Sequence, residues 1–272
     1  MPSAAPSYSG NYPLESHALE IERLRIQSSA MAPDAQLMLD RIGVQEGWKC
    51  LDMGCGPCGI AGLLSPRAGS SGHVLGLDRD AAFLQHARSD APANVEFLQG
   101  DAYQTGLPAE SFNLVHLRFV ASTAGSPERL LREAIRIARP GGTVALQEPD
   151  GASLNCYPPH PAWDRLKAAL LGAFTGVGAD LQLARQLYAL AIQAGLEDVQ
   201  YRSFIVAVRS TDPLIDYLPS TVESLRGAII RLGLLSEAEL PILLDECRNH
   251  LRRPHASFTM YTVAQVWGRT AR

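Results

Sequence analysis

Residues 51–59 read Leu51-Asp52-Met53-Gly54-Cys55-Gly56-Pro57-Cys58-Gly59, and the expected architecture follows from them. A short apolar run, Lys49–Met53, leads into the glycines, and a helical pattern begins at Ile60. Glycine permits the unusual backbone angles of a tight turn and lets a ligand approach closely. The free N–H groups at the start of the following helix suit a carboxylate or a phosphate. The stretch therefore predicts a strand, a glycine loop and a helix that together bind a ligand.

Strands and helices alternate along the chain after this loop. The expected strands are Lys49–Met53, His73–Asp78, Val95–Leu98, Phe112–Arg118 and Thr143–Glu148. The expected helices are Ile60–Leu64, Ala81–Arg88 and one that starts at Pro127 after a capping Ser126. Such alternation is typical of a parallel sheet with helices on both faces, and the continuous apolar strands fit burial there.

Further helices precede the first strand and follow the fifth. We expect one N-terminal helix over Ser16–Ser29 and a second after Pro33, with an apolar face of Leu37, Met38 and Ile42. A proline-rich connection, Pro149–Pro161, follows the fifth strand. Beyond it we expect two more strands of the same sheet, Val199–Val208 and Phe258–Trp267. The expected helices there are Trp163–Phe174, Leu181–Ala194, Pro213–Arg231 and Glu237–Leu251, the last two forming an insertion over the sheet edge.

Composition excludes several classes of protein. The 272 residues include 24 Lys and Arg against 28 Asp and Glu, so the net charge is −4 and the pI is about 6.0. This balance argues against a nucleic-acid-binding protein and against binding to an anionic membrane. No apolar run reaches the ~18–20 residues of a membrane helix, and the N-terminus does not resemble a secretory signal. The odd number of cysteines, five, argues against a disulfide framework and favours a cytoplasmic location.

Two acidic residues follow the glycine loop at the ends of later strands. Asp78 lies about twenty residues beyond the loop, where it could bind the two hydroxyls of a ribose. Asp101 follows the third strand and could accept a hydrogen bond from an adenine amino group. Because parallel strands end at the same edge of a sheet, the loop and both acids predict an adenosine site.

These motifs resemble those of class I S-adenosylmethionine-dependent methyltransferases, in the small-molecule branch of quinone and natural-product biosynthesis. The motifs are residues 51–59, Gly76-Leu77-Asp78, Gly100-Asp101-Ala102 and Arg139-Pro140-Gly141-Gly142. The resemblance covers about residues 14–150. It implies an α/β fold with a Rossmann-like seven-stranded sheet, mostly parallel with an antiparallel last strand, a helical N-terminal lid and a helical insertion. It divides the chain into a lid at 1–45, a cofactor-binding core at 46–150 and substrate-side helices with the last strands at 151–272.

The resemblance also implies which residues bind S-adenosylmethionine. The methionine part would contact the glycine loop, and the residues expected there are Gly54 and Gly56, Asp52 at the amino group directly or through water, and Leu117 or Arg118 at the tail. The nucleoside part would contact Asp78 at the ribose and Arg79, Asp101 and Ala102 around the adenine. Tyr12 and Gln27 belong to a segment that would close over the cofactor, although an ordinary surface helix explains them equally well.

Catalytic groups are harder to assign because methyl transfer needs mainly alignment of the reactants. Glu148 ends the fifth strand and could orient a substrate or accept a proton, or instead pair with a neighbouring arginine. His160 lies in the proline-rich connection and could reach the same cavity, or lie on the loop surface. His116, within a strand, is interpreted as a packed or hydrogen-bonded histidine. The substrate pocket would be walled by Trp163, Phe174, Tyr188 and Tyr217, for which core packing is the alternative.

Other ligands and activities stay open. The spacing Gly54-x-Gly56-x-x-Gly59 also suits NAD, although Asp52 ahead of the loop would repel a pyrophosphate. Cys55 and Cys58 form a C-x-x-C pair without further zinc ligands at fitting spacing, so no metal is expected. The expected reaction is methyl transfer to an O, N or C atom of a small, fairly apolar metabolite. The alternatives are a non-methylating enzyme such as a cyclase and a cofactor-binding scaffold, and a homo-oligomer is left open.

Overall fold

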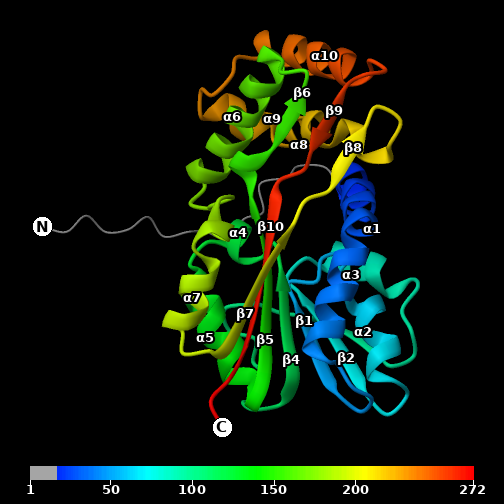
Figure 1. Ribbon diagram of the computed structural model, residues 1–272, viewed down its shortest axis with the longest axis vertical. Coiled ribbons are helices and arrows are strands. Elements are labelled where there is room, and N and C mark those ends of the chain that lie inside the picture. The colour runs from blue at the N-terminus through cyan, green and yellow to red at the C-terminus, as the bar shows by residue number, and fades with distance from the viewer. Residues whose placement is uncertain (1–16) are drawn as a thin grey trace, which may run out of the picture.

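A seven-stranded sheet occupies the lower part of the molecule in Figure 1, with the strand order β3-β2-β1-β4-β5-β10-β7. The computed structural model describes residues 17–272. The first five strands run parallel, and β10 pairs antiparallel with both β5 and β7. The predicted sheet, mostly parallel with an antiparallel last strand, is therefore confirmed. The strands are β1 Lys49–Met53, β2 His73–Asp78, β3 Val95–Gln99, β4 Phe112–Arg118, β5 Ala138–Asp150, β7 Glu197–Phe204 and β10 Thr262–Arg269.

Helices cover both faces of this sheet. In Figure 1, α1, α2 and α3 lie on one side of the strands, and α5 and α7 lie on the other. Alternate strand residues face the two layers, so that Cys50 and Leu114 pack with the first group of helices while Leu51 and Val115 pack with the second. The helices are α1 His17–Ile42, α2 Ala61–Ala68, α3 Ala81–Arg88, α4 Ala121–Ala124, α5 Pro127–Ile137 and α7 Leu187–Gln193.

The N-terminal part of the described chain is one helix, not the two that we expected. α1 continues through Pro33 although proline removes a backbone N–H from the helical pattern. Met31 and Ala35, on either side of the proline, are buried, and Met38 and Leu39 extend the same buried stripe. This continuous apolar stripe stabilises a single helix. Leu37, expected on the apolar face, is 41% exposed.

A second, smaller sheet and four helices form an upper lobe beyond the carboxyl ends of the parallel strands (Figure 1). The two long strands expected near the C-terminus are each divided, because each leaves the large sheet and continues into this small one. The small sheet consists of β6 Asn155–Tyr157, β9 Ser257–Thr259 and β8 Ala207–Arg209. The helices of the lobe are α6 Pro161–Gly176, α8 Tyr217–Ser224, α9 Arg226–Arg231 and α10 Glu239–Leu251. Three short 3-10 helices connect the elements: Gly151–Ser153, Leu183–Arg185 and Pro213–Asp216.

The helices α8 to α10 form the predicted insertion, since they lie in the chain between β8 and β9. Together with α6 they enclose an apolar core of their own. At the start of α5, Ser126 occupies the cap position without a side-chain capping bond, so the predicted cap is wrong. Within residues 17–272, no helix is long and apolar enough to cross a bilayer. The division of the chain at residues 45 and 150 stays a prediction.

Candidate functional site

A cavity of about 450 Å³ lies where β1, β2 and β4 end, and its volume is in the range of ~300–1,000 Å³ typical of small-molecule sites. One wall is the glycine loop, and the others come from the ends of the strands and from α1. The structure brings most of the predicted binding residues to this one cavity: Gln27, Asp52, Gly54, Gly56, Asp78, Arg79, Asp101, Ala102 and Arg118.

The glycine loop needs glycine at three positions for different physical reasons. Gly54 and Gly56 have φ angles of +77° and +56°, which other residues adopt with strain. A Cβ atom at Gly54 would also lie 2.4 Å from Cγ2 of Val120. At Gly59 a Cβ atom would lie 2.2 Å from Oδ2 of Asp52. The loop is therefore packed closely against both β1 and the residues that follow β4.

Asp52 lies with its carboxylate against the glycine loop and binds the residue that follows it. Its side chain is buried, its Oδ2 accepts a hydrogen bond of 2.8 Å from the backbone N of Ile60, and its Oδ1 lies 2.9 Å from Nδ1 of His116. Both oxygens are thus bound within the protein, and the predicted contact with an amino group would have to share them. The N–H of Ile60, which the sequence suggested as free for an anion, is already bound. His116 is fully buried and hydrogen-bonded, as interpreted from the sequence.

The two strand-end acids lie on the same cavity. The carboxylate of Asp78 accepts hydrogen bonds from the backbone N of Gly56, at 2.8 Å, and from that of Asp80, at 2.9 Å. Burial raises the pKa of Asp78, and these two hydrogen bonds oppose the rise. The Oδ1 atom of Asp101 accepts a hydrogen bond of 2.9 Å from the backbone N of Tyr103. The acids are held in fixed orientations beside the loop.

Arg118 joins three walls of the cavity. Its Nη2 atom donates to Oγ of Ser28, at 3.0 Å, and to the carbonyl oxygen of Cys58, at 2.9 Å. Its Nη1 atom is buried and has no hydrogen-bond partner within residues 17–272. Burying a charged donor without an acceptor is unfavourable, so this atom indicates a site for an anionic ligand group. Leu117, the other residue expected at this place, is fully buried in the sheet core and does not line the cavity.

The two predicted catalytic residues do not reach the cavity, and these assignments are corrected here. Glu148 is fully buried, and its two oxygens accept from the backbone N atoms of Ala121, at 2.9 Å, and Ser122, at 3.0 Å. Burial raises the pKa of Glu148 to about 7, although these hydrogen bonds oppose the rise. His160 lies in the upper lobe, where its Nδ1 accepts from the backbone N of Ala162 at the start of α6. Neither side chain lines the cavity.

The expected aromatic wall is also wrong. Trp163, Phe174 and Tyr217 are buried in the core of the upper lobe, and Tyr188 is 44% exposed beside Tyr201. In the described part of the chain, no residue after Ala124 lines the cavity. Core packing, the alternative for these residues, explains the positions of Trp163, Phe174 and Tyr217, whereas Tyr188 lies on the surface.

Sequence reasoning named Gln27 but missed the other residues of the wall that α1 provides. Glu20, Leu24, Ser28 and Met31 line the cavity together with Gln27. Their spacing of three and four residues places them on one face of a helix, so this periodicity could have revealed them. The Nε2 atom of Gln27 donates to the hydroxyl of Tyr261 over 3.1 Å, which attaches α1 to the start of β10. Tyr12, the other predicted lid residue, lies outside the described residues.

The cysteines of the loop are free thiols. Burial raises the pKa of Cys55, while Cys58 is half-buried on the cavity wall. Among residues 17–272, no cluster of three or more His, Cys, Asp or Glu side chains is arranged to hold a metal ion.

Comparisons with known proteins agree with this geometry. A family model described as "Methyltransferase domain" matches residues 51–146. A 2-phytyl-1,4-naphtoquinone methyltransferase of Thermosynechococcus vestitus is 34% identical over 113 residues, which cover 41% of this chain and 50% of the relative. The chain spans about half the length of the curated relatives it matches.

Solved structures show the same fold over most of the chain. The YcgJ protein of Bacillus subtilis superposes with a TM-score of 0.57 at 20% identity, covering 87% of this chain and 97% of its own. An S-adenosylmethionine-dependent methyltransferase of Aquifex aeolicus superposes with a TM-score of 0.52 at 16% identity, covering 92% and 99%. Residues 51–146 thus match a methyltransferase domain, and the chain shares the fold of these solved structures, one of which is an S-adenosylmethionine-dependent methyltransferase.

Proposed function

We propose that this protein transfers a methyl group from S-adenosylmethionine to a small molecule. The observation that carries the proposal is the single cavity of about 450 Å³ that unites the glycine loop, Asp78, Asp101 and the unpartnered Nη1 atom of Arg118. The chemistry of these groups suits the parts of that cofactor. Asp78 would bind the ribose hydroxyls, Asp101 and Ala102 would flank the adenine, and Arg118 would bind the methionine carboxylate.

The hydrogen bond from the backbone N of Ile60 to Asp52, where the loop meets α2, favours S-adenosylmethionine over NAD as the ligand. A dinucleotide places its pyrophosphate on the free N–H groups at the start of the helix after the loop. Here the N–H of Ile60 donates to Asp52, so an internal carboxylate already occupies that position. A buried negative charge at this point would repel a pyrophosphate but is compatible with a cationic sulfonium and an ammonium group.

The protein contributes to the reaction mainly by binding and orientation. S-adenosylmethionine supplies an already activated methyl group when bound. Arg118 and Asp78 would hold the methionine carboxylate and the ribose, on either side of the sulfonium, and this fixes the direction in which its methyl group points. Leu24 and Met31 of α1 and Phe119 after β4 line the cavity with apolar surface that excludes water. Neither Glu148 nor His160 lines the cavity, which suits a reaction governed by alignment.

The acceptor in this proposal is a small, fairly apolar metabolite with a nucleophilic O, N or C atom. The apolar lining from α1 and the naming of one relative as a naphthoquinone methyltransferase support this class. All five cysteines are free and four are buried, which supports a reducing, cytoplasmic setting.

Product formation tests the proposal. The full chain is incubated with S-adenosylmethionine and a panel of small quinols and phenols, and S-adenosylhomocysteine is measured. We expect release that requires both protein and acceptor. Tight binding of the cofactor without product for any acceptor would instead favour the non-methylating alternatives, a cyclase or a scaffold.

A further inference from the structure

A chain of buried polar side chains crosses five neighbouring strands of the sheet. Its members come from β1, β4, β5, β10 and β7, in the order in which these strands lie. We call it the polar relay, and its members are Asp52, His116, Gln147, Gln265 and Arg202. Successive atoms lie 2.9, 2.8, 2.7 and 2.5 Å apart. The first four side chains are at most 2% exposed.

The chemistry of the members allows one arrangement of protons. Arginine can only donate, so the Oε1 atom of Gln265 must accept from Nη1 of Arg202. The amide nitrogen of Gln265 then donates to Oε1 of Gln147, whose own amide nitrogen donates to Nε2 of His116. His116 is consequently neutral, with its proton on Nδ1, from which it donates to Asp52. Each donor that joins two members of the relay therefore points toward the Asp52 carboxylate.

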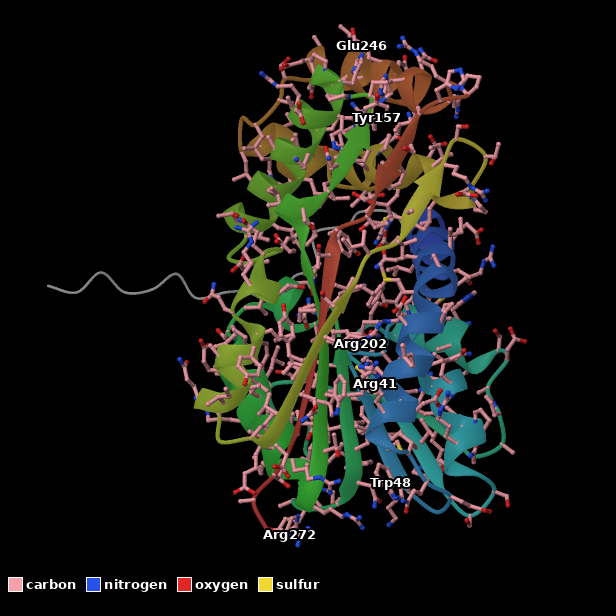
Figure 2. The ribbon with its side chains drawn as sticks, viewed as in Figure 1. Arg41, Trp48, Tyr157, Arg202, Glu246 and Arg272 are labelled. Carbon is pink, nitrogen blue, oxygen red and sulfur yellow. The ribbon has the colours of Figure 1, made fainter. Side chains whose placement is uncertain are left out.

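One end of the relay lies at the glycine loop, and the other end lies at α1, the helix that also lines the cavity. At one end, Asp52 binds the N–H of Ile60, where the glycine loop meets α2. At the other end, Nη2 of Arg202 pairs with Oδ1 of Asp34 on α1 at 2.8 Å, and the amide of Gln265 donates to the carbonyl oxygen of Asp34 at 3.1 Å. Figure 2 shows Arg202 at mid-height on β7, next to α1. The same helix lines the cavity through Gln27 and Met31.

Polar groups in the centre of a sheet require an explanation. Apolar side chains would fill these positions with less desolvation, and a polar chain is tolerated only when every member is bonded. Here each bond orients the next group, and hydrogen bonds in such a series strengthen one another. The group oriented last is Asp52, which holds the ligand-binding loop.

We propose that the polar relay holds the glycine loop in its ligand-binding conformation, and that Gln147 and His116 are positioning residues that act through Asp52. The identity of the ligand, though not the action on the loop, rests on the proposed function. Loss of Gln147 would leave His116 free to change its tautomer or ring orientation. Asp52 would then lose its fixed donor, and the bond from Ile60 would open more often.

The test compares Gln147→Met, which has similar volume but cannot donate, with Thr143→Val. Thr143 is buried on the same strand and takes no part in the relay. Three quantities are measured in the full chain: the ¹⁵N spectrum of the His116 ring, amide hydrogen exchange at Ile60, and the affinity for S-adenosylhomocysteine. We expect wild-type His116 to carry its proton on Nδ1. In Gln147→Met, the amide hydrogen of Ile60 should exchange at least about tenfold faster than in the wild type, and S-adenosylhomocysteine should bind at least about tenfold more weakly. Thr143→Val should match the wild type in both measurements.

A second pair of variants separates positioning from packing. His116→Asn keeps a donor close to the Nδ1 position, and His116→Leu does not. The affinity of His116→Asn should stay within about threefold of the wild type, while His116→Leu should bind about tenfold more weakly. If Gln147→Met does not fold, this pair still tests whether His116 positions Asp52.

Two results would overturn the proposal. One is a wild-type His116 that carries its proton on Nε2, because His116 would then no longer donate a hydrogen bond to Asp52. The other is equal exchange at Ile60 in Gln147→Met and Thr143→Val. If the wild type binds no S-adenosylhomocysteine, the proposed function fails, while the exchange rates still decide whether the relay holds the loop.

Discussion

The Nη2 atom of Arg118 donates to the carbonyl oxygen of Cys58 over 2.9 Å and so ties the end of β4 to the glycine loop. The same atom donates to Ser28, which lies on α1. Because Nη2 is engaged twice within the protein, the guanidinium is held in one orientation. Its Nη1 atom is buried and has no protein partner among the described residues, in a side chain that lines the cavity. In the proposed function, this guanidinium would bind the methionine carboxylate.

We predict that Arg118→Met weakens binding of S-adenosylmethionine by at least about tenfold, since a hydrogen bond to a charged group contributes ~1.5–3 kcal/mol. Decarboxylated S-adenosylmethionine lacks the group that Arg118 would bind, so its affinity should change much less. Calorimetric titration of both ligands with both proteins measures the difference. Arg25→Met, on the exposed side of α1, is the matched control. An equal loss for both ligands would contradict a carboxylate contact.

We predict that Gly54→Ala destabilises the protein by about 1–3 kcal/mol, because the φ angle of +77° is strained for alanine and the added Cβ would collide with Val120. Gly62→Ala is the control. Gly62 lies in α2, and a Cβ there would meet no atom within 4 Å. That change should raise the free energy of unfolding by about 0.5–1 kcal/mol. Urea unfolding of the three proteins measures both effects, and a stable Gly54→Ala would show that the loop has another conformation.

We predict that the free energy of unfolding falls at low pH because His250 becomes protonated. Burial lowers the pKa of His250, whose Nε2 lies 2.8 Å from the carbonyl oxygen of Pro158 and whose Nδ1 is buried without a partner within residues 17–272. His160, which stacks on it at 4.6 Å, and Arg253 lower that pKa further. The unfolded chain therefore binds more protons, and stability falls as the pH falls through about 6.5.

Urea unfolding between pH 5 and 8 measures this effect. The wild type should lose more stability below pH 6.5 than His250→Gln, whose amide can still donate to Pro158. The slope that one histidine contributes cannot exceed about 1.4 kcal/mol per pH unit. Parallel curves for the two proteins would show that His250 titrates normally in the folded state.

Glu148 has the opposite pH dependence. Its pKa in the folded protein is raised to about 7 by burial, so the folded state binds the extra proton and stability is lost as the pH rises from about 4.5 through 7. The stability of Glu148→Gln relative to the wild type should therefore increase from pH 5 to pH 8. Because Glu148 does not line the cavity, its replacement should leave the affinity for S-adenosylhomocysteine within about twofold. A large loss of affinity would show that Glu148 contributes to ligand binding after all.

Local sequence signals predicted the parallel half of the sheet well. β1, β2, β4 and α3 have the bounds that apolar runs and their flanking turn residues indicated. In such segments, the glycine, proline and aspartate residues that end a helix or strand lie next to it in the sequence. The same proximity made Asp78 and the glycine loop recognisable, since both directly follow strands.

The errors concern features that depend on distant contacts. Pro33 indicated a helix start, but the buried Met31 and Ala35 on either side of it come together in one continuous stripe against the rest of the protein. Glu148 was expected to end its strand, but β5 continues to Asp150. The backbone N atoms of Ala121 and Ser122 bind its carboxylate, and Glu148 does not line the cavity. Neither partner of such a contact identifies the other in a single sequence.

Calorimetric titration of the wild type and of Asp78→Ala with S-adenosylmethionine and with NAD tests the central claim most directly. The account predicts that only S-adenosylmethionine binds, and that loss of the carboxylate at the ribose weakens its binding at least about tenfold. Binding of NAD, or an affinity for S-adenosylmethionine that Asp78→Ala leaves unchanged, would contradict it.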